Sequence, residues 1–386
     1  MAYNNAKLKI GIDARCLEWT RGGVARYLVN VLSDWARDES SKNTYVLYFQ
    51  NKIPEDAFLK SKNFELKLIK GPKFLKKHRI LTEQILLPFE LWKDALDIFF
   101  ATWYSAPLIL PKIKTIIAAW DISYSTHPKH YSLANRISLG FFSKMSCKKA
   151  DGIITCSDYD AQQIHKYYKI PSKKIKTVYL AADDRFVKER DEGKIAEVKR
   201  KYNLPDKFLL SLGVIYNRRN VDVIINAFFQ IENNYPDIGL VVIGPNKTQP
   251  FIDIEHIMEP IIKNKKGIYM NWFEDEDLPL LYQASMFYIC TSTVDGETIL
   301  LKEAMKSGTP VITSSLLSGT IGGNGYIISD PNSLEETVCV IKRAILSSEQ
   351  TKEFVKEGIA WNSQFSWGNV SSESLDFIEA TVTIEQ

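Results

Sequence analysis

The chain has 386 residues, enough for two domains with separate hydrophobic cores. Its residues are 45% hydrophobic and 25% charged, as in an ordinary globular protein, and its net charge of +3 is too small to indicate nucleic-acid binding. The five cysteines are scattered, which indicates buried thiols in a reducing compartment rather than disulfides or a metal site. Neither a signal peptide nor a bilayer-spanning apolar run is expected, so we predict a cytoplasmic protein.

The first half of the chain begins with a strand, a glycine loop, a helix and a second strand. Residues 9–13 are predicted to form a buried strand, and Arg21-Gly22-Gly23 a tight loop. Residues 24–37 carry apolar side chains at helical spacing, and residues 44–49 form the next strand. A further buried strand is expected at residues 115–119.

A strongly basic segment occupies residues 60–79. Its basic residues are Lys60, Lys62, Lys67, Lys70, Lys73, Lys76, Lys77 and Arg79, and its one acidic residue is Glu65. Apolar residues are interleaved among them, so the segment fits a patch that rests on anionic lipid. It fits a solvated, partly mobile face equally well, and both readings stay open. No nucleic-acid recognition motif accompanies it.

The same order of elements recurs in the second half of the chain. A strand is expected at residues 208–212, a loop at Gly213, a helix at residues 221–231 and a strand at residues 240–243. This repetition predicts an α/β fold with two doubly wound parallel-sheet domains. The charged residues 183–200 suit the connection between them, and residues 370–380 suit a terminal helix.

Two common nucleotide motifs are excluded. Arg21–Arg26 is not a G-x-G-x-x-G fingerprint, and the second strand is followed by Gln50 and Asn51 rather than a ribose-binding acid. The chain contains neither G-K-S nor G-K-T, which excludes a P-loop. We therefore expect the ligand between the domains, at the carboxyl ends of both sheets.

The most informative segment is residues 293–314, T-V-D-G-E-T-I-L-L-K-E-A-M-K-S-G-T-P-V-I-T-S. A loop with Gly296 turns into a helix at residues 298–307, Gly308 closes the helix, and a buried strand follows. The amide groups and the dipole at such a helix start attract phosphate. Asp295 and Glu303 place carboxylates before and within the helix.

This segment resembles the nucleotide-sugar signature of the retaining GT-B glycosyltransferases of the bacterial "group 1" (family 4) type. Residues 303–311, E-A-M-K-S-G-T-P-V, match the second half of that signature closely, whereas Asp295 stands where the family has Glu. Gly213-Val-Ile-Tyr-Asn-Arg218-Arg219-Asn220 resembles the family's G-x-x-x-x-R-K-N. The resemblance implies two Rossmann-like domains that face each other across a cleft: an acceptor-binding domain, 1–190, and a nucleotide-sugar-binding domain, 191–364. The terminal helix, 365–386, would cross back to the first domain.

The resemblance also implies roles for single residues. Arg218 and Arg219 would stabilise the leaving pyrophosphate, Asp295 would hold the transferred sugar, and Asp121 would orient a sugar hydroxyl or the acceptor. Glu303 would bind the ribose hydroxyls. The expected donor-binding residues are Gly22, Gly23, Gly213, Gly296, Glu297, Thr298, Ile299, Leu300 and Glu303. No metal or other cofactor is expected, and the strings Asp158-Tyr-Asp160 and Asp275-Glu-Asp277 are interpreted as helix starts.

The largest departure from the family is Trp120, where many relatives have a His before Asp121. Trp120 fits a stacking surface for a sugar ring and a packing residue at the sheet edge equally well. His127 is interpreted as a structural histidine rather than a replacement for the missing one.

Taken together, the resemblance predicts a retaining hexosyltransferase of surface polysaccharide synthesis. The expected donor is a UDP-hexose, with GDP-mannose next because Ile12-Asp13-Ala14-Arg15 resembles surface-polysaccharide mannosyltransferases. The acceptor is a saccharide or a lipid-linked glycan, and residues 60–79 would contact the inner face of the membrane. The alternative is a non-catalytic sugar-nucleotide-binding partner subunit on a decayed glycosyltransferase scaffold.

Overall fold

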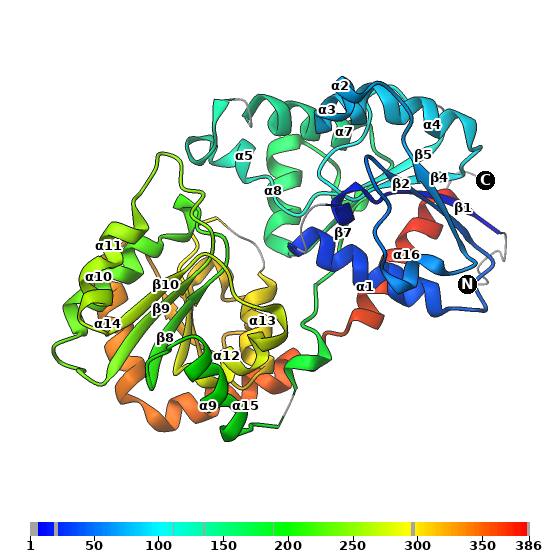
Figure 1. Ribbon diagram of the computed structural model, residues 1–386. Helices are drawn as coiled ribbons and strands as arrows, with labels where there is room; N and C mark the ends of the chain where they lie inside the picture. Colours follow the sequence, from blue (N-terminus) through cyan, green and yellow to red (C-terminus); the bar gives the residue numbers. More distant parts are fainter. Residues whose placement is uncertain are drawn as a thin grey trace. The chain divides into compact units, whose positions relative to one another are not determined.

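The structure is a computed structural model, and it describes residues 7–18, 22–110, 112–133, 136–187, 189–294 and 298–383. The chain divides into two compact units, residues 1–180 with 367–386 and residues 181–366 (Figure 1). Each unit contains one parallel β-sheet with helices on both faces. The predicted fold class, α/β with two doubly wound parallel sheets, is confirmed.

The sheet of the first unit has seven parallel strands in the order β3-β2-β1-β4-β5-β6-β7. The strands are β1 (Lys9–Asp13), β2 (Thr44–Phe49), β3 (Phe64–Leu68), β4 (Ile98–Ala101), β5 (Lys114–Ala118), β6 (Gly152–Thr155) and β7 (Ile175–Thr177). The central strands are buried along their length, as expected where helices cover both faces of a parallel sheet. The strand order reverses between β1 and β4, so a crevice is expected at their carboxyl ends.

The first unit also contains the last helix of the chain. Its helices are α1 (Gly23–Arg37), α2 (Lys73–Lys76), α3 (Arg79–Leu81), α4 (Leu87–Lys93), α5 (Ser123–Thr126), α7 (Phe142–Lys149), α8 (Asp158–Tyr168) and α16 (Trp367–Thr383). A π-helical turn, Thr82–Leu86, joins α3 to α4. The α1 side chains Tyr27 and Trp35 are buried against α16, where Tyr27 bonds to Ser374 Oγ at 2.8 Å and Trp35 Nε1 donates to Ser371 O at 3.4 Å.

The sheet of the second unit has six parallel strands in the order β10-β9-β8-β11-β12-β13. The strands are β8 (Lys207–Leu212), β9 (Ile238–Ile243), β10 (Gly267–Met270), β11 (Phe287–Cys290), β12 (Val311–Ser314) and β13 (Tyr326–Ile328). The helices are α9 (Glu192–Lys201), α10 (Val221–Ile231), α11 (Ile254–Lys263), α12 (Leu278–Ala284), α13 (Ile299–Lys306), α14 (Leu334–Leu346) and α15 (Ser348–Asn362). One hydrophobic cluster joins the sheet to α10, α11 and α14, and a second joins its other face to α9, α12 and α13.

The interpretation of residues 183–200 as a connection between domains is wrong for most of the segment. Phe186 is fully buried in the core of the second unit, and α9 begins at Glu192. Ile195 and Val198 face inward from α9 at a three-residue spacing. The charges that suggested a linker lie on the solvent side of an ordinary amphipathic helix.

Among the helices that the structure describes, none is long and apolar enough to cross a lipid bilayer.

Candidate functional site

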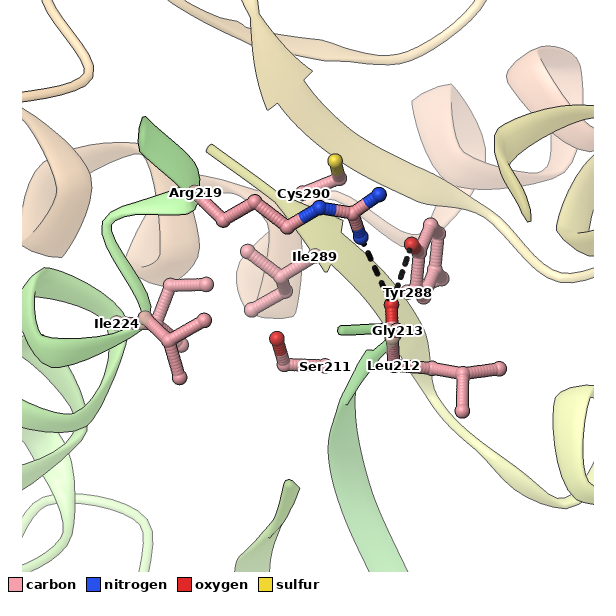
Figure 2. A pocket seen from close by; sticks show the side chains of 9 residues that line it. Ser211, Leu212, Gly213, Arg219, Ile224, Tyr288, Ile289 and Cys290 are labelled. Carbon is pink, nitrogen blue, oxygen red and sulfur yellow. Dashed lines mark hydrogen bonds between the residues drawn. The ribbon is translucent and has the colours of Figure 1, made fainter. Parts of the chain in front are cut away.

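The carboxyl end of β8 holds Gly213 and one of the two predicted arginines together. Arg219 Nη1 donates to Leu212 O at 3.4 Å, and the Tyr288 hydroxyl donates to the same oxygen at 3.1 Å (Figure 2). Gly213 has φ +122°, and a Cβ there would lie 2.4 Å from Arg219 Nη1 and 2.8 Å from Leu300 Cδ1. A glycine is therefore required for the arginine and the start of α13 to approach this strand end.

The loop that carries both arginines is fixed by the end of β11. Thr291 Oγ1 donates to Arg219 O at 2.9 Å, and the Thr293 amide and hydroxyl donate to Arg218 O at 2.7 and 3.1 Å. Asn220 adopts a left-handed conformation, φ +48°, at the start of α10. The Arg218 guanidinium lies 4.4 Å from the centre of the Tyr216 ring. Both arginines are thus positioned through their backbones by threonines for which the sequence indicated no role.

A small pocket lies beneath Arg219, walled by Ile224, Ile289 and Tyr288 (Figure 2). Its volume is about 10 Å³, room for about one water molecule. Burial raises the pKa of Tyr288 well above its usual range, so the phenol stays protonated as a hydrogen-bond donor. A ligand of sugar-nucleotide size has to bind outside this pocket.

The predicted phosphate-binding helix is present as α13. Thr298 is the extended residue before the helix, with φ −136° and ψ 124°, and Thr298 and Ile299 are buried. Leu300 lies beside Gly213, so the start of α13 and the Arg219 loop are neighbours. The predicted residues Asp295, Gly296 and Glu297 lie outside the described residues. The structure therefore brings together Gly213, Arg218, Arg219 and residues 298–300 of the predicted set.

Glu303 is buried within α13. Its Oε2 accepts a hydrogen bond from the Tyr282 hydroxyl at 3.2 Å, and the residue is 1% exposed. The neighbouring Lys302 is also buried, with Nζ 3.7 Å from the centre of the Phe365 ring. A ribose can reach the Glu303 carboxylate only if the atoms that now cover it are displaced.

The predicted residues of the first unit follow β1 and β5. Gly22 and Gly23 are exposed at the start of α1, and a Cβ on Gly23 would meet no atom within 4 Å. Asp121 is partly exposed, and its carboxylate accepts from the Ser123 amide at 2.8 Å and the Tyr104 hydroxyl at 3.4 Å. Unlike Gly213, Gly23 is not required by local packing.

Trp120 is a packing residue. It is buried, its ring centre lies 4.5 Å from that of Tyr27, and its Nε1 donates to Thr102 O at 3.0 Å. These contacts occupy the indole and leave it no face for a sugar ring. His127 Nδ1 lies 2.9 Å from Thr126 Oγ1, a local contact within its own loop.

The two Asp-x-Asp strings lie at helix starts, as the sequence indicates. Asp158 is the first residue of α8, and Ser157 caps that helix by accepting from the Asp160 amide at 3.0 Å. Asp277 ends the 3₁₀ helix Asp275–Asp277, just before α12, and accepts from Lys201 at 2.8 Å. Each string therefore has a structural explanation in its own helix start.

A buried ionic network at the carboxyl end of β1 was not predicted. Arg15 Nη2 lies 2.6 Å from Asp13 Oδ2 and 3.0 Å from Glu83 Oε2, and all three side chains are almost fully buried. Ser105 donates to the second Glu83 oxygen at 2.6 Å. Paired and hydrogen-bonded in this way, the charges fix the π-helical turn that carries Glu83 against β1.

Comparison with known proteins shows that the second unit is similar to a family of glycosyl transferases. The sequence profile described as "Glycosyl transferases group 1" matches residues 194–361. Two curated proteins of Escherichia coli are similar to the chain. The serotype-specific mannosyltransferase WbdA is 24% identical over 236 residues, 59% of this chain and 29% of WbdA, so the match spans less than a third of that protein. The O-antigen chain mannosyltransferase B is 24% identical over 262 residues, 66% of this chain and 68% of the relative.

Solved structures share the fold. HepE of Anabaena, in complex with UDP-glucose, superposes with a TM-score of 0.71 at 16% sequence identity, over 97% of this chain and 100% of HepE. At this identity the likeness is one of fold, and it agrees with the GT-B architecture expected from the sequence. The family resemblance based on residues 213–220 and 303–311 is confirmed by the profile match. Residues 194–361 thus match the family of group 1 glycosyl transferases, and the second unit is similar to members of that family.

Proposed function

We propose that the protein transfers a hexose from a nucleotide sugar to a saccharide or lipid-linked acceptor, with retention of anomeric configuration. The observation that carries the proposal is the meeting of Gly213, Arg219 and the start of α13 at the carboxyl end of β8. Negative charge grows on the leaving pyrophosphate during transfer. Arg218, Arg219 and the amides at the start of α13 would stabilise that charge in place of a metal ion.

The remaining predicted residues orient the donor and the acceptor in this proposal. Glu303 accepts from the ribose hydroxyls, Asp295 holds the transferred sugar, and Asp121 orients a hydroxyl. The acceptor oxygen attacks the anomeric carbon on the face that the phosphate leaves, and the leaving phosphate takes the proton of the acceptor hydroxyl. This route needs no protein nucleophile and no cofactor.

The proposed donor is a UDP-hexose, with GDP-mannose next. HepE, which shares the fold, was solved in complex with UDP-glucose. WbdA and the O-antigen chain mannosyltransferase B are named as mannosyltransferases, which supports mannose as the transferred sugar. The name of the second relative also supports a role in O-antigen or other surface polysaccharide synthesis. We accordingly propose a cytoplasmic enzyme that contacts the membrane peripherally through residues 60–79.

The burial of Trp120 favours one alternative, a non-catalytic sugar-nucleotide-binding subunit. Many family members have a His at this position, and here a packed indole replaces it. A protein that binds the nucleotide and lacks turnover would fit that loss. The two functions differ in donor turnover, so one assay separates them.

Nucleotide release from UDP-glucose, UDP-galactose and GDP-mannose tests the proposal. The purified chain is assayed with and without a polyprenyl-phosphate-linked glycan fraction, and with EDTA. We expect release from one donor, faster with acceptor and unchanged by EDTA. Arg219→Ala should slow nucleotide release by about 10²-fold, the effect expected when one hydrogen-bond donor to the transition state is lost. The matched control is Arg200→Ala, because Arg200 is exposed on α9.

Two results would contradict the proposal. Release that Arg219→Ala leaves unchanged would remove the arginine from the reaction. Binding of a donor with no release in any acceptor fraction would support the non-catalytic subunit instead. The anomeric coupling constant of the product, measured by NMR, tests retention separately.

A further inference from the structure

One helical segment of the first unit exposes apolar side chains to solvent along one face. The segment comprises α3, the π-helical turn Thr82–Leu86 and α4, along the upper edge of this unit in Figure 1. Leu81, Ile85, Phe89 and Trp92 are 36%, 41%, 53% and 52% exposed. Their spacing of four, four and three residues places them on one side of the helix. The Phe89 and Trp92 rings also contact each other edge to face, with centroids 5.5 Å apart.

Three polar residues of this segment are buried, although a surface helix usually turns such residues to solvent. Thr82, Glu83 and Glu90 are buried. Glu83 is held by the Arg15 guanidinium at 3.0 Å and by the Ser105 hydroxyl at 2.6 Å. These bonds fix the rotation of the segment, so the apolar face is turned outward by the fold itself. Contiguous exposed apolar surface of this kind marks an interaction site.

Basic residues flank the apolar face at both ends. Before it, α2 and the following turn carry Lys73, Lys76 and Lys77, with Phe74 66% exposed among them. The three lysines and Arg79 line a groove of about 570 Å³ together with Gln50 and Asn51. At the other end, Lys93 is exposed beside Trp92 and pairs with Glu90 at 3.0 Å. An apolar strip with aromatic residues and lysine flanks is typical of a helix that lies in the interface of an anionic membrane.

We propose that the face formed by Leu81, Ile85, Phe89 and Trp92 docks on an anionic phospholipid bilayer, with the lysines of α2 bound to lipid phosphates. The inference rests on the membrane contact in the proposed function and extends it. The basic segment supplies the electrostatic attraction, and the apolar face supplies the insertion. Each component alone gives weak, reversible binding, and the two together give stable anchoring.

The charges around the apolar face favour an anionic bilayer over a second copy of the chain as its partner. A two-fold interface through this face would bring lysine-bearing ends of one copy near lysine-bearing surfaces of the other. The same lysines are attracted to an anionic lipid surface by about 1 kcal/mol each. The position of the face on the first unit also suits an acceptor that is itself embedded in lipid.

Vesicle co-sedimentation of the whole chain tests the proposal. Vesicles of phosphatidylcholine with phosphatidylglycerol are compared with vesicles of phosphatidylcholine alone, at low and high salt. We expect binding to the anionic vesicles, and Phe89→Ser with Trp92→Ser should lower the partition coefficient by about tenfold or more. The matched control is Phe251→Ser with Trp272→Ser, because these side chains are 71% and 69% exposed on the second unit. This control should bind as the wild type does.

The basic component has its own variant, Lys73→Gln with Lys76→Gln and Lys77→Gln. We expect weaker binding that depends less on salt, whereas the Phe89 and Trp92 variant should keep the salt dependence. Far-UV circular dichroism and nucleotide release in solution check that each variant is folded. Neither aromatic residue lies in the candidate donor site, so release from the donor should be unchanged.

Three outcomes would overturn the proposal. The wild type would fail to bind anionic vesicles, or the Phe89 and Trp92 variant would bind as tightly as the control. The third is a wild-type dimer in sedimentation velocity that this variant makes monomeric, without vesicle binding, which would assign the face to a second copy. A protein that binds vesicles and releases no nucleotide would refute the proposed function alone, so the two failures are distinct.

Discussion

Replacing Gly213 by Ala is a direct perturbation of the candidate donor site. The glycine has φ +122°, a conformation that costs an alanine about 1–3 kcal/mol. The added Cβ would lie 2.4 Å from Arg219 Nη1 and 2.8 Å from Leu300 Cδ1. Both atoms are ends of flexible side chains, so they can move aside. The arginine then loses its position over Leu212 O, and the Leu300 side chain is displaced from this strand end.

The strain predicts a fall in stability, and the displacement predicts a fall in affinity. The second unit spans residues 181 to 366, which is 366 − 180 = 186 residues. For a unit of this size, 1 kcal/mol lowers the melting temperature by about 2–4 °C, so we expect a fall of about 2–12 °C. Misplacing one charge-assisted contact to the pyrophosphate should weaken nucleotide binding by about 10- to 100-fold.

Thermal unfolding followed by circular dichroism measures the first effect, and calorimetric titration with UDP and GDP measures the second. Gly23→Ala is the control for stability, because a Cβ there meets no atom within 4 Å and the residue opens a helix. It should leave the melting temperature unchanged or slightly higher. A Gly213→Ala protein with wild-type melting temperature and nucleotide affinity would refute the geometry described for this strand end.

Three further predictions follow from single contacts. Tyr282→Phe removes the hydroxyl that donates to Glu303, and it should lower the free energy of unfolding in urea by about 1–3 kcal/mol. Tyr167→Phe, at an exposed position, should leave that free energy almost unchanged. Equal losses in the two variants would contradict the buried hydrogen bond. Trp120→Ala should lower the free energy of unfolding by about 3–5 kcal/mol. Trp120→Phe should lower it less, because the phenyl ring keeps part of the contact with Tyr27. If Trp120→Phe instead raised the donor or acceptor KM at unchanged stability, the indole would be a sugar-binding surface. Burial raises the pKa of the Cys16 and Cys147 thiols to about 12, and Cys339 is exposed. At pH 8 a disulfide reagent should therefore label one thiol rapidly, and Cys339→Ser should abolish that phase; rapid labelling of Cys16 or Cys147 would contradict their burial.

The strands and helices were predictable where a local pattern decides them. β1, β2 and α10 have the predicted bounds, because β-branched and aromatic runs or helical spacing mark both ends. The segment 183–200 was misread, because a short charged amphipathic helix has the composition of a linker. Only the buried positions of Ile195 and Val198 distinguish the two.

The motifs of the candidate site were predictable from the sequence, whereas the residues that hold these motifs in place were not. Residues 213–220 and 303–311 are contiguous strings, so the sequence displays them. The threonines that fix the arginine loop are more than 70 residues away in sequence, and Tyr282 is 21 residues from Glu303. Contacts of that kind depend on the strand order and leave no local signal. The side chain of Trp120 likewise had two equal interpretations until its contacts with Tyr27 and Thr102 were known.

The apolar face of the first unit shows the same limit. Residues 81–92 read L-T-E-Q-I-L-L-P-F-E-L-W, with apolar side chains on more than one side of a helix. Leu87 and Leu91 pack into the core while Phe89 and Trp92 point to solvent. The local sequence does not show which apolar side is buried, because the pairing of Glu83 with the distant Arg15 helps to fix the rotation of the segment.

The nucleotide site at the end of β8 is tested by calorimetric titration of the wild type, Arg219→Ala and the control Arg200→Ala with UDP, GDP and ADP. We expect one nucleotide to bind, Arg219→Ala to weaken its affinity by about tenfold or more, and Arg200→Ala to have no effect. Equal affinity in all three proteins, or no binding of any of the three nucleotides, would contradict the assignment of the nucleotide site to Gly213, Arg219 and the start of α13.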